Sequence, residues 1–304
     1  MEMFNKKALK ERIGDLKKSN NLKTLEPIER YVLQKLKQYK VGSSYDVQCE
    51  EMPYFDTIGY TEYATNFIMS PLNLKMKEDM IRDAEFDTSD YPILDYVSHI
   101  KANIENKIAN KYKDRATDFE GYTDVSALVV LPGSNKLKQS VCLNKLKSIK
   151  KLYGDDIYFK PHPLTTHAFI GELKDLFGEK TILPREIDLY HFLPKVDKVY
   201  TTHMSESAVY ALALGKEIEP IDVYNEIRNG SFYNINVGLF NNQVNGKEWI
   251  NKVFSSPKSG IINPTLDINW KNKVDLYLEY IMNKREQYKD WYIDSRVPKD
   301  KNKY

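Results

Sequence analysis

The chain has 304 residues, 41% of them hydrophobic, and its 45 basic side chains nearly balance its 43 acidic ones. This length and composition suffice for a sizeable core and exclude an intrinsically disordered protein. The formal charge of +2 lacks the basic excess of proteins that bind mainly to phosphate backbones, so charge alone does not imply a nucleic-acid partner. The two cysteines, Cys49 and Cys142, indicate neither a disulfide framework nor a zinc site.

The beginning of the chain runs directly into charged residues and lacks the apolar centre of a signal peptide. No apolar run approaches the roughly 20 residues that a membrane span needs. We therefore expect a cytoplasmic protein without integral membrane contact. The Lys-rich stretches 6–23 and 284–303 are interpreted as solvated helix faces or frayed ends.

Residues 1–125 predict a smaller, irregular and helix-rich α/β domain. Apolar residues recur at helical spacing over 6–18, 26–39 and 92–112. Between these helices, residues 46–73 contain more turn residues and β-formers. We expect this N-terminal domain to lie on the acceptor side of the site proposed below.

From residue 126 onward, strands and helices alternate regularly. The apolar run 127–131 is typical of a strand buried on both faces, and a helix at 136–153 and a strand at 157–159 complete a βαβ unit. Further helices are predicted at 167–177, 188–193 and 205–214, and further strands at 181–183, 198–201 and 218–221. This alternation predicts a parallel, Rossmann-like sheet in a domain of residues 126–260. After a segment at 249–254, residues 261–304 are expected to form C-terminal helices, including a long one at 270–291, that cross back to the N-terminal domain.

Three polar segments follow predicted strands, and ligands of such sheets bind beyond the carboxyl ends of the strands. The first is Pro132-Gly133-Ser134, in which the small residues Gly133 and Ser134 let backbone N–H groups approach a ligand. A Pro-Gly pair is also a common turn, so an ordinary turn remains an alternative interpretation of this segment.

The second segment is Lys160-Pro161-His162-Pro163. The two prolines restrict the backbone around His162, so its imidazole has few orientations, and an anionic substrate is the first expectation. The alternative is a structural histidine bonded to the backbone. Lys160 either adds positive charge to the same anion or pairs with a neighbouring carboxylate.

The third segment spans residues 201–207, Thr-Thr-His-Met-Ser-Glu-Ser, and opens a predicted helix. A helix start exposes unpaired N–H groups, and hydroxyls such as those of Thr202, Ser205 and Ser207 either cap the helix or donate to a phosphate. One serine is enough for a cap, whereas two serines, two threonines and His203 together exceed what a cap needs, so the pattern favours phosphate binding. The Gly-rich dinucleotide fingerprint, the phosphate-binding Gly-Lys-Ser/Thr loop and the Gly-x-Ser-x-Gly elbow are absent, which weighs against dehydrogenases, ATPases and serine hydrolases.

Segments 160–163, 183–187 (Leu-Pro-Arg-Glu-Ile) and 204–207 together resemble the donor-binding half of GT-B-fold glycosyltransferases. The resemblance is closest to the bacterial sialyltransferases that use CMP-sugars, and looser to capsular Kdo transferases and teichoic-acid polymerases. It covers roughly residues 126–225.

This resemblance implies that His162 meets the donor phosphate, that Glu186 holds the ribose, and that Ser205 and Ser207 bind the phosphate. Breaking a glycosyl phosphate bond leaves negative charge on the departing phosphate, which an imidazole, hydroxyls and a helix start stabilise. We therefore expect no metal and no cofactor. In agreement, no Asp-x-Asp pair follows a predicted strand.

Transfer to a hydroxyl also needs a base that removes the acceptor proton. Residues 54–63 are similar to the Asp-Gly-x-x-Glu-Tyr segment of the same sialyltransferases, in which an aspartate is the base. Asp56 is therefore the expected base. Aligning Gly59 and Glu62 leaves Asp56 slightly out of register, so Glu62 is the alternative base and Asp56 then caps a turn.

The sequence thus predicts a glycosyltransferase that moves a sugar from a nucleotide-sugar donor, CMP-linked by the resemblance, to a glycan or lipid-linked saccharide. The richness in Lys, Asn and Tyr is typical of bacteriophage proteins, so an enzyme that glycosylates a hydroxymethylated pyrimidine in DNA is an alternative, which would need a basic cleft and aromatic wedges. A non-catalytic nucleotide-sugar-binding protein is another. A sugar-phosphate epimerase is less favoured because no paired acid and base residues are identified.

Overall fold

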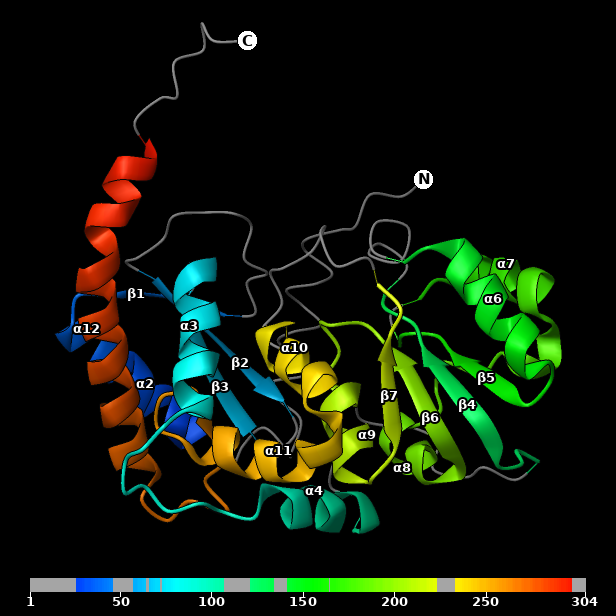
Figure 1. Ribbon diagram of the computed structural model, residues 1–304, viewed down its shortest axis with the longest axis horizontal. Coiled ribbons are helices and arrows are strands. Elements are labelled where there is room, and N and C mark those ends of the chain that lie inside the picture. The colour runs from blue at the N-terminus through cyan, green and yellow to red at the C-terminus, as the bar shows by residue number, and fades with distance from the viewer. Residues whose placement is uncertain are drawn as a thin grey trace, which may run out of the picture. The chain divides into compact units, whose positions relative to one another are not determined.

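The computed structural model describes residues 26–45, 57–63, 66–71, 73–106, 121–133, 141–163, 165–222 and 233–296. The chain forms two compact units. The first, Asp95–Asn251, contains a parallel sheet and is called the parallel-sheet unit. The second joins Leu25–Leu94 to Lys252–Tyr304 and is called the mixed-sheet unit. Figure 1 labels most of the helices and strands of both.

The sheet of the parallel-sheet unit has, in the described part of the chain, the strands β4 (Val125–Val130), β5 (Ile157–Lys160), β6 (Val196–Thr201) and β7 (Glu217–Pro220). Their order is β5-β4-β6-β7, every pairing is parallel, and the arrows point the same way in Figure 1. This arrangement confirms the predicted α/β class with a Rossmann-like parallel sheet.

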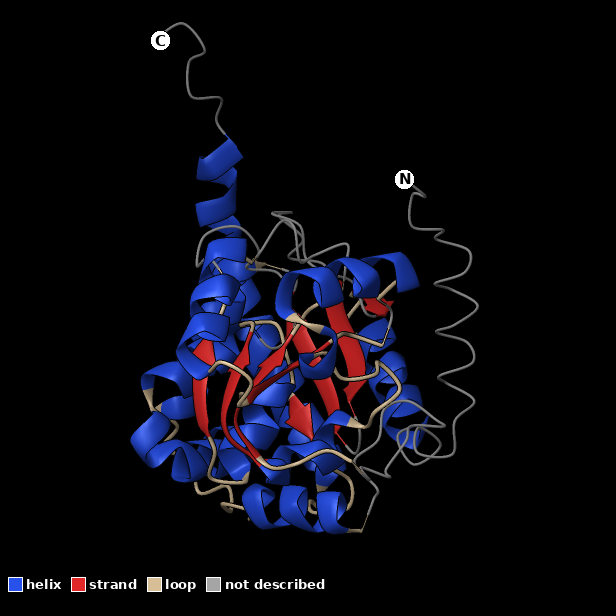
Figure 2. Cartoon of the chain, turned by 90° about the vertical axis from the view of Figure 1, so that its right-hand side faces the viewer, coloured by secondary structure: helices blue, strands red, loops and turns tan. Residues whose placement is uncertain are grey.

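Helices cover both faces of this sheet, as the apolar run of β4 predicts. On one face, alternate β4 residues such as Val129 pack with α6 (Leu143–Tyr153) and α7 (His167–Phe177) in one core cluster. On the other face, Tyr158 of β5 makes edge-on ring contacts with Tyr122 and with Phe192 of α8 (Leu189–Phe192). Helix α9 (Ser207–Ala213) also contacts β6 and β7. Figure 2 shows blue helices around the red strands of the chain.

The remaining helical elements of this unit are α4 (Tyr96–Glu105), α10 (Tyr233–Asn241), the 3-10 turns η1 (Glu179–Thr181), η2 (Leu193–Lys195) and η3 (Gln243–Asn245), and most of α11 (Gly246–Ser255). Helix α7 has its predicted bounds. Helix α6 begins at Leu143, seven residues after the predicted start at 136, and residues 134–140 lie outside the description.

The strand predicted at 181–183 is wrong: only Ile182 bridges to the sheet, opposite Phe159. Residues before it wind into η1, where the Thr181 hydroxyl donates to the carbonyl of Phe177 over 2.9 Å. Pro184, which follows closely, has no N–H with which to continue a strand.

The mixed-sheet unit has, among the described residues, β1 (Gly42–Tyr45), β2 (Thr57–Tyr63), β3 (Asn66–Pro71) and β8 (Ile261–Ile262). Their order is β1-β2-β3-β8, with β1 and β2 parallel and the other pairs antiparallel. The helices are α2 (Glu26–Gln38), α3 (Leu74–Glu85) and α12 (Trp270–Arg296). The predicted helix at 26–39 and the β-forming character of 46–73 are confirmed where described. The predicted helix at 6–18 lies outside the description.

The C-terminal segment completes the mixed-sheet unit. The N–H of Met69 in β3 donates to the carbonyl of Gly260 over 2.8 Å, and a Cβ on Gly260 would lie 2.2 Å from the Met69 carbonyl oxygen. The φ of +70° at Gly260 also favours glycine. Farther along, the Tyr280 hydroxyl of α12 donates to Asp83 of α3 over 2.9 Å. The chain thus passes from one unit to the other at 94/95 and at 251/252, whereas the sequence predicts domain boundaries at 125 and 260. The donor and acceptor roles of these domains stay a prediction.

Helix α12 carries a fully buried lysine. The Nζ of Lys273 donates to the Phe254 carbonyl over 2.6 Å. Burial lowers the pKa of Lys273 to about 7, with Asp267 acting in the opposite direction. Although α12 is long, none of the described helices combines the length and the apolar character needed to cross a membrane.

The low pKa of Lys273 predicts a pH-dependent stability. Between about pH 7 and the ordinary lysine value of 10.5, the unfolded chain binds more protons at this residue than the folded chain does, so its contribution to the free energy of unfolding rises with pH. Relative to Lys273→Met, the wild type should gain up to about 1.4 kcal/mol per pH unit across this window. Urea unfolding of both proteins at a series of pH values measures the difference, and a pH-independent difference contradicts the prediction.

Candidate functional site

The carboxyl ends of the parallel strands form one edge of the sheet, and ligands of such sheets bind at that edge. After β4 the chain goes to β5, and after β6 it goes to β7, on the opposite side. Connections that leave two neighbouring strands in opposite directions open a crevice between the strand ends, the topological switch point of the sheet. Here the switch point lies between the residues that follow β4 and those that follow β6. Gly133 follows β4 and is half-buried.

His162 lies just past the end of β5, one strand away from the switch point. Its side chain is half-buried, and its carbonyl accepts the N–H of Thr165 over 2.9 Å in a turn. The structure therefore places His162 at the carboxyl edge, as the sequence analysis expects, while its contact with a donor phosphate stays a prediction.

Lys160, by contrast, is buried and holds backbone. Its Nζ donates to the carbonyls of Pro161, over 2.9 Å, and of Arg185, over 3.0 Å. These bonds tie the end of β5 to the loop that carries Glu186. The structure thus gives Lys160 a role beyond the two considered from the sequence, and its binding of substrate stays a prediction.

Glu186 offers a carboxylate beside this loop, with its side chain 55% exposed. Arg185 donates from Nε to Oε1 of Glu186 over 2.8 Å, and from a terminal nitrogen to the Thr165 carbonyl over 2.8 Å. Partial burial raises the pKa of Glu186, but the Arg185 hydrogen bond, a backbone N–H and the charges of Arg185 and Lys160 outweigh it and lower the pKa below its ordinary value. At neutral pH the group is therefore an ionised acceptor, suited to a hydroxyl such as that of a ribose.

Hydroxyl groups form a chain after β6. Oγ1 of Thr201 lies 2.8 Å from Oγ of Ser207, which lies 2.7 Å from Oγ of Ser205. Ser207 is 1% exposed and Thr202 is also buried, whereas Ser205 is half-buried. Ser205 is therefore the hydroxyl at the accessible end of the chain, and Ser207 supports it from inside. Phosphate binding by Thr202, Ser205 and Ser207 stays a prediction.

The expected acceptor base is not brought to this edge by any described contact. Asp56 lies outside the described residues, as does Ser134. Glu62, the alternative base, lies in β2 of the mixed-sheet unit. The identity of the base therefore stays a prediction.

The structure reveals a carboxylate–imidazole pair that sequence reasoning missed. Nδ1 of His203 lies 2.7 Å from Oδ1 of Asp222, and the His203 N–H donates to Oδ2 over 3.0 Å. The two side chains are 6% and 7% exposed. Because β6 and β7 pair with Thr201 opposite Pro220, the residues two places later lie side by side. A carboxylate directly after the last predicted strand was the available signal.

Helix α10 holds the same loop from another direction. Nδ2 of Asn236 donates to the carbonyls of His203, over 2.8 Å, and of Ser205, over 2.7 Å. The rings of Tyr233 and Phe240 lie 5.5 and 4.8 Å from the His203 ring, measured between centroids. The His203 loop is thus fixed by side chains from β7's end and from α10.

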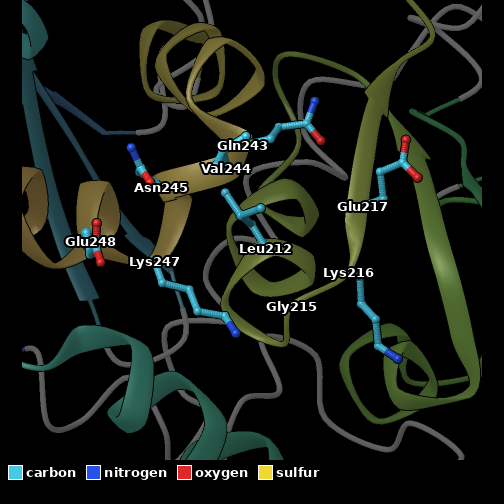
Figure 3. Close-up of a pocket in the computed structure, with 9 residues that line it drawn as sticks. All are labelled: Leu212, Gly215, Lys216, Glu217, Gln243, Val244, Asn245, Lys247 and Glu248. Carbon is cyan, nitrogen blue, oxygen red and sulfur yellow. The ribbon is translucent and has the colours of Figure 1, made fainter.

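A separate hollow of about 480 Å³ lies elsewhere in this unit (Figure 3). Residues of the α9–β7 turn and of η3 and α11 line it, among them Gly215, Glu217 and Lys247. Glu217 is the first residue of β7, so this hollow lies at an amino end of the sheet, opposite to the edge where such sheets bind ligands. We therefore favour the carboxyl edge as the candidate site.

No three His, Cys, Asp or Glu side chains of the described residues cluster closely enough to hold a metal ion. Metal independence stays a prediction.

Comparisons with known proteins give the following. No protein-family model matches the chain, and no curated protein matches its sequence. Among solved structures, Thermosulfurimonas dismutans KpsC, beta Kdo 2,4 transferase, is similar with a TM-score of 0.41 and 13% identity, over 55% of this chain and 61% of that one. Its beta Kdo 2,7 transferase gives a TM-score of 0.37 and 16% identity, over 62% and 68%. The chain thus spans about three fifths of the first structure. The α/β class of the fold follows from the order and the parallel pairing of its strands.

The backbone contacts of Lys160 predict a structural cost for its removal. Lys160→Met leaves the Pro161 and Arg185 carbonyls without this donor, and should lower the free energy of unfolding by about 1–3 kcal/mol. Lys147→Met, at an exposed position of α6, is the matched control and should have little effect. Chemical denaturation measures the free energy of unfolding of both variants. A Lys160→Met protein as stable as the wild type would show that these two hydrogen bonds contribute nothing to the fold.

Proposed function

We propose that this protein is a glycosyltransferase that transfers a sugar from a nucleotide-sugar donor, CMP-linked, to a hydroxyl of a glycan or lipid-linked saccharide. The observation that carries the proposal is that polar side chains follow the carboxyl ends of β5 and β6, and that Lys160 ties the loop of Glu186 to the end of β5. His162, Glu186 and Ser205 come from successive loops, and the sequence motifs that contain them resemble those of CMP-sugar-dependent sialyltransferases.

The spacing of the strands favours a ligand larger than a phosphate. β5 and β6 lie on either side of β4, so their ends are two strand spacings apart, about 10 Å. His162 follows β5 and Ser205 follows β6, so their side chains approach a phosphate over the end of β4 from its two sides, and the rest of the ligand extends along the same edge. A nucleotide sugar, with its base, ribose, phosphate and sugar, has this extent.

The chemistry of the edge fits departure of a phosphate. When the bond between the anomeric carbon and the phosphate oxygen breaks, the electron pair stays on the phosphate. The His162 imidazole and the Ser205 hydroxyl act as donors toward that charge, in a partly water-excluded site. The ionised Glu186 accepts hydrogen bonds from the ribose hydroxyls. The acceptor proton leaves to a carboxylate, for which Asp56 and Glu62 are the candidates.

Among the described residues, we find no observation that favours the DNA-modifying alternative over transfer to a saccharide. The non-catalytic alternative is separated by experiment, because a binding protein takes up the nucleotide sugar without consuming it.

Replacing His162 tests the proposal. His162→Ala should lower transfer from a CMP-sugar by about two to three orders of magnitude, because a donor to the departing phosphate is lost, while the melting temperature changes little. His99→Ala in α4, away from the carboxyl edge, is the matched control and should retain transfer. Product formation is followed by chromatography with a panel of CMP-sugars and saccharide acceptors.

Full transfer by His162→Ala refutes the role of this residue. A wild-type protein that binds nucleotide sugars without hydrolysing or transferring them is the non-catalytic alternative.

A further inference from the structure

His203 occupies a better position for a ligand than His162 does. It follows β6 directly, and the crevice of this sheet lies between the ends of β4 and β6. His162 follows β5, one strand farther away. On topology alone, the imidazole closest to the switch point is therefore that of His203.

Asp222 determines the orientation of this imidazole. One carboxylate oxygen accepts from the His203 main-chain N–H and the other lies 2.7 Å from Nδ1. Because a carboxylate accepts, Nδ1 carries a proton, and Nε2 is the second nitrogen of the ring. A ring that donates from Nε2 as well as from Nδ1 is an imidazolium, whose positive charge lies between Asp222 on one side and the bound anion on the other.

The surroundings indicate more than an anchor for the loop. A carboxylate and an imidazole that are both more than nine-tenths buried carry a desolvation cost that apolar residues would avoid. Asn236, fully buried, uses its Nδ2 on the loop carbonyls, while its Oδ1 has no hydrogen-bond partner among the described residues, which also costs stability. A buried polar atom without a partner calls for an explanation, and a ligand site at the end of β6 provides one.

We propose that His203 is a phosphate-contacting residue of the nucleotide-sugar site, and that Asp222 and Asn236 are its positioning residues. The inference rests on the proposed function, because it assigns the ligand of the same edge. Nε2 of His203 donates a hydrogen bond to a non-bridging phosphate oxygen of the nucleotide. The contact is non-covalent, and no bond to His203 forms or breaks during transfer.

Two substitutions separate the two nitrogens of the ring. Asn places an amide nitrogen near the position of Nδ1, so His203→Asn keeps a donor for Asp222 and loses the group at Nε2. Gln places its amide nitrogen near Nε2, so His203→Gln keeps a donor for the phosphate. Calorimetric titration with CMP and with cytidine, which lacks the phosphate, measures what each nitrogen contributes.

We expect His203→Asn to weaken CMP binding about ten- to hundredfold while cytidine binding is unchanged, as befits a lost charge-assisted hydrogen bond. His203→Gln should retain more CMP affinity than His203→Asn. Asp222→Asn and Asn236→Ala, which misplace the ring, should lower the ratio of CMP to cytidine affinity. His99→Asn in α4 is the control and should leave the ratio as in the wild type.

The outcomes are distinguishable. If the wild type binds CMP and His203→Asn keeps the wild-type ratio of CMP to cytidine affinity, His203 is only an anchor of the loop and this inference is overturned, while the proposed function stands. An equal loss for CMP and cytidine overturns it as well, because a merely structural defect affects both ligands. If the wild type binds neither CMP nor another nucleoside monophosphate, the proposed function fails and the inference fails with it.

Discussion

The central position of β4 is the constraint on which the candidate site depends. β4 pairs in parallel with β5 on one side and with β6 on the other, so that Val129 lies opposite both Phe159 and Tyr200. This shared register aligns the carboxyl ends of the three strands, so the loops that follow them begin at the same edge of the sheet. Both faces of β4 are packed, so a shift by one residue would turn each side chain toward neighbours of a different shape.

The class of the fold was predictable because its signals are local. A continuous apolar run and helical spacing identify β4 and α7 without knowledge of their partners. The wrong strand prediction at 181–183 and the missed helix α3 also have local causes, but not ones that apolar spacing shows. At Ile182, a single bridge replaces the predicted strand because the hydrogen bonds of Thr181 and the nearby Pro184 compete with strand pairing. An apolar pattern does not show whether such local interactions outweigh pairing. Helix α3 was missed although Asn73 caps it, accepting the N–H of Met76.

The candidate site was predictable only in part. Motif spacing placed His162, Glu186 and Ser205 after strands, and the structure puts the first and last of them at the carboxyl edge. Asp222 was missed because its significance arises from the register of β6 with β7, a pairing between segments about 20 residues apart. Similarly, nothing in the sequence near Lys160 shows that its ammonium group meets main-chain carbonyls rather than a ligand. Contacts of this kind depend on tertiary structure.

The discontinuity of the mixed-sheet unit has a consequence for biosynthesis. β3 needs β8 as its neighbour, and β8, Gly260 and α12 leave the ribosome long after β3 does. The parallel-sheet unit is encoded between these segments, and its strands can pair before β8 is synthesised. β1, β2 and β3 therefore emerge before the parallel-sheet unit but complete their sheet after it, so the edge of β3 stays unpaired for much of synthesis.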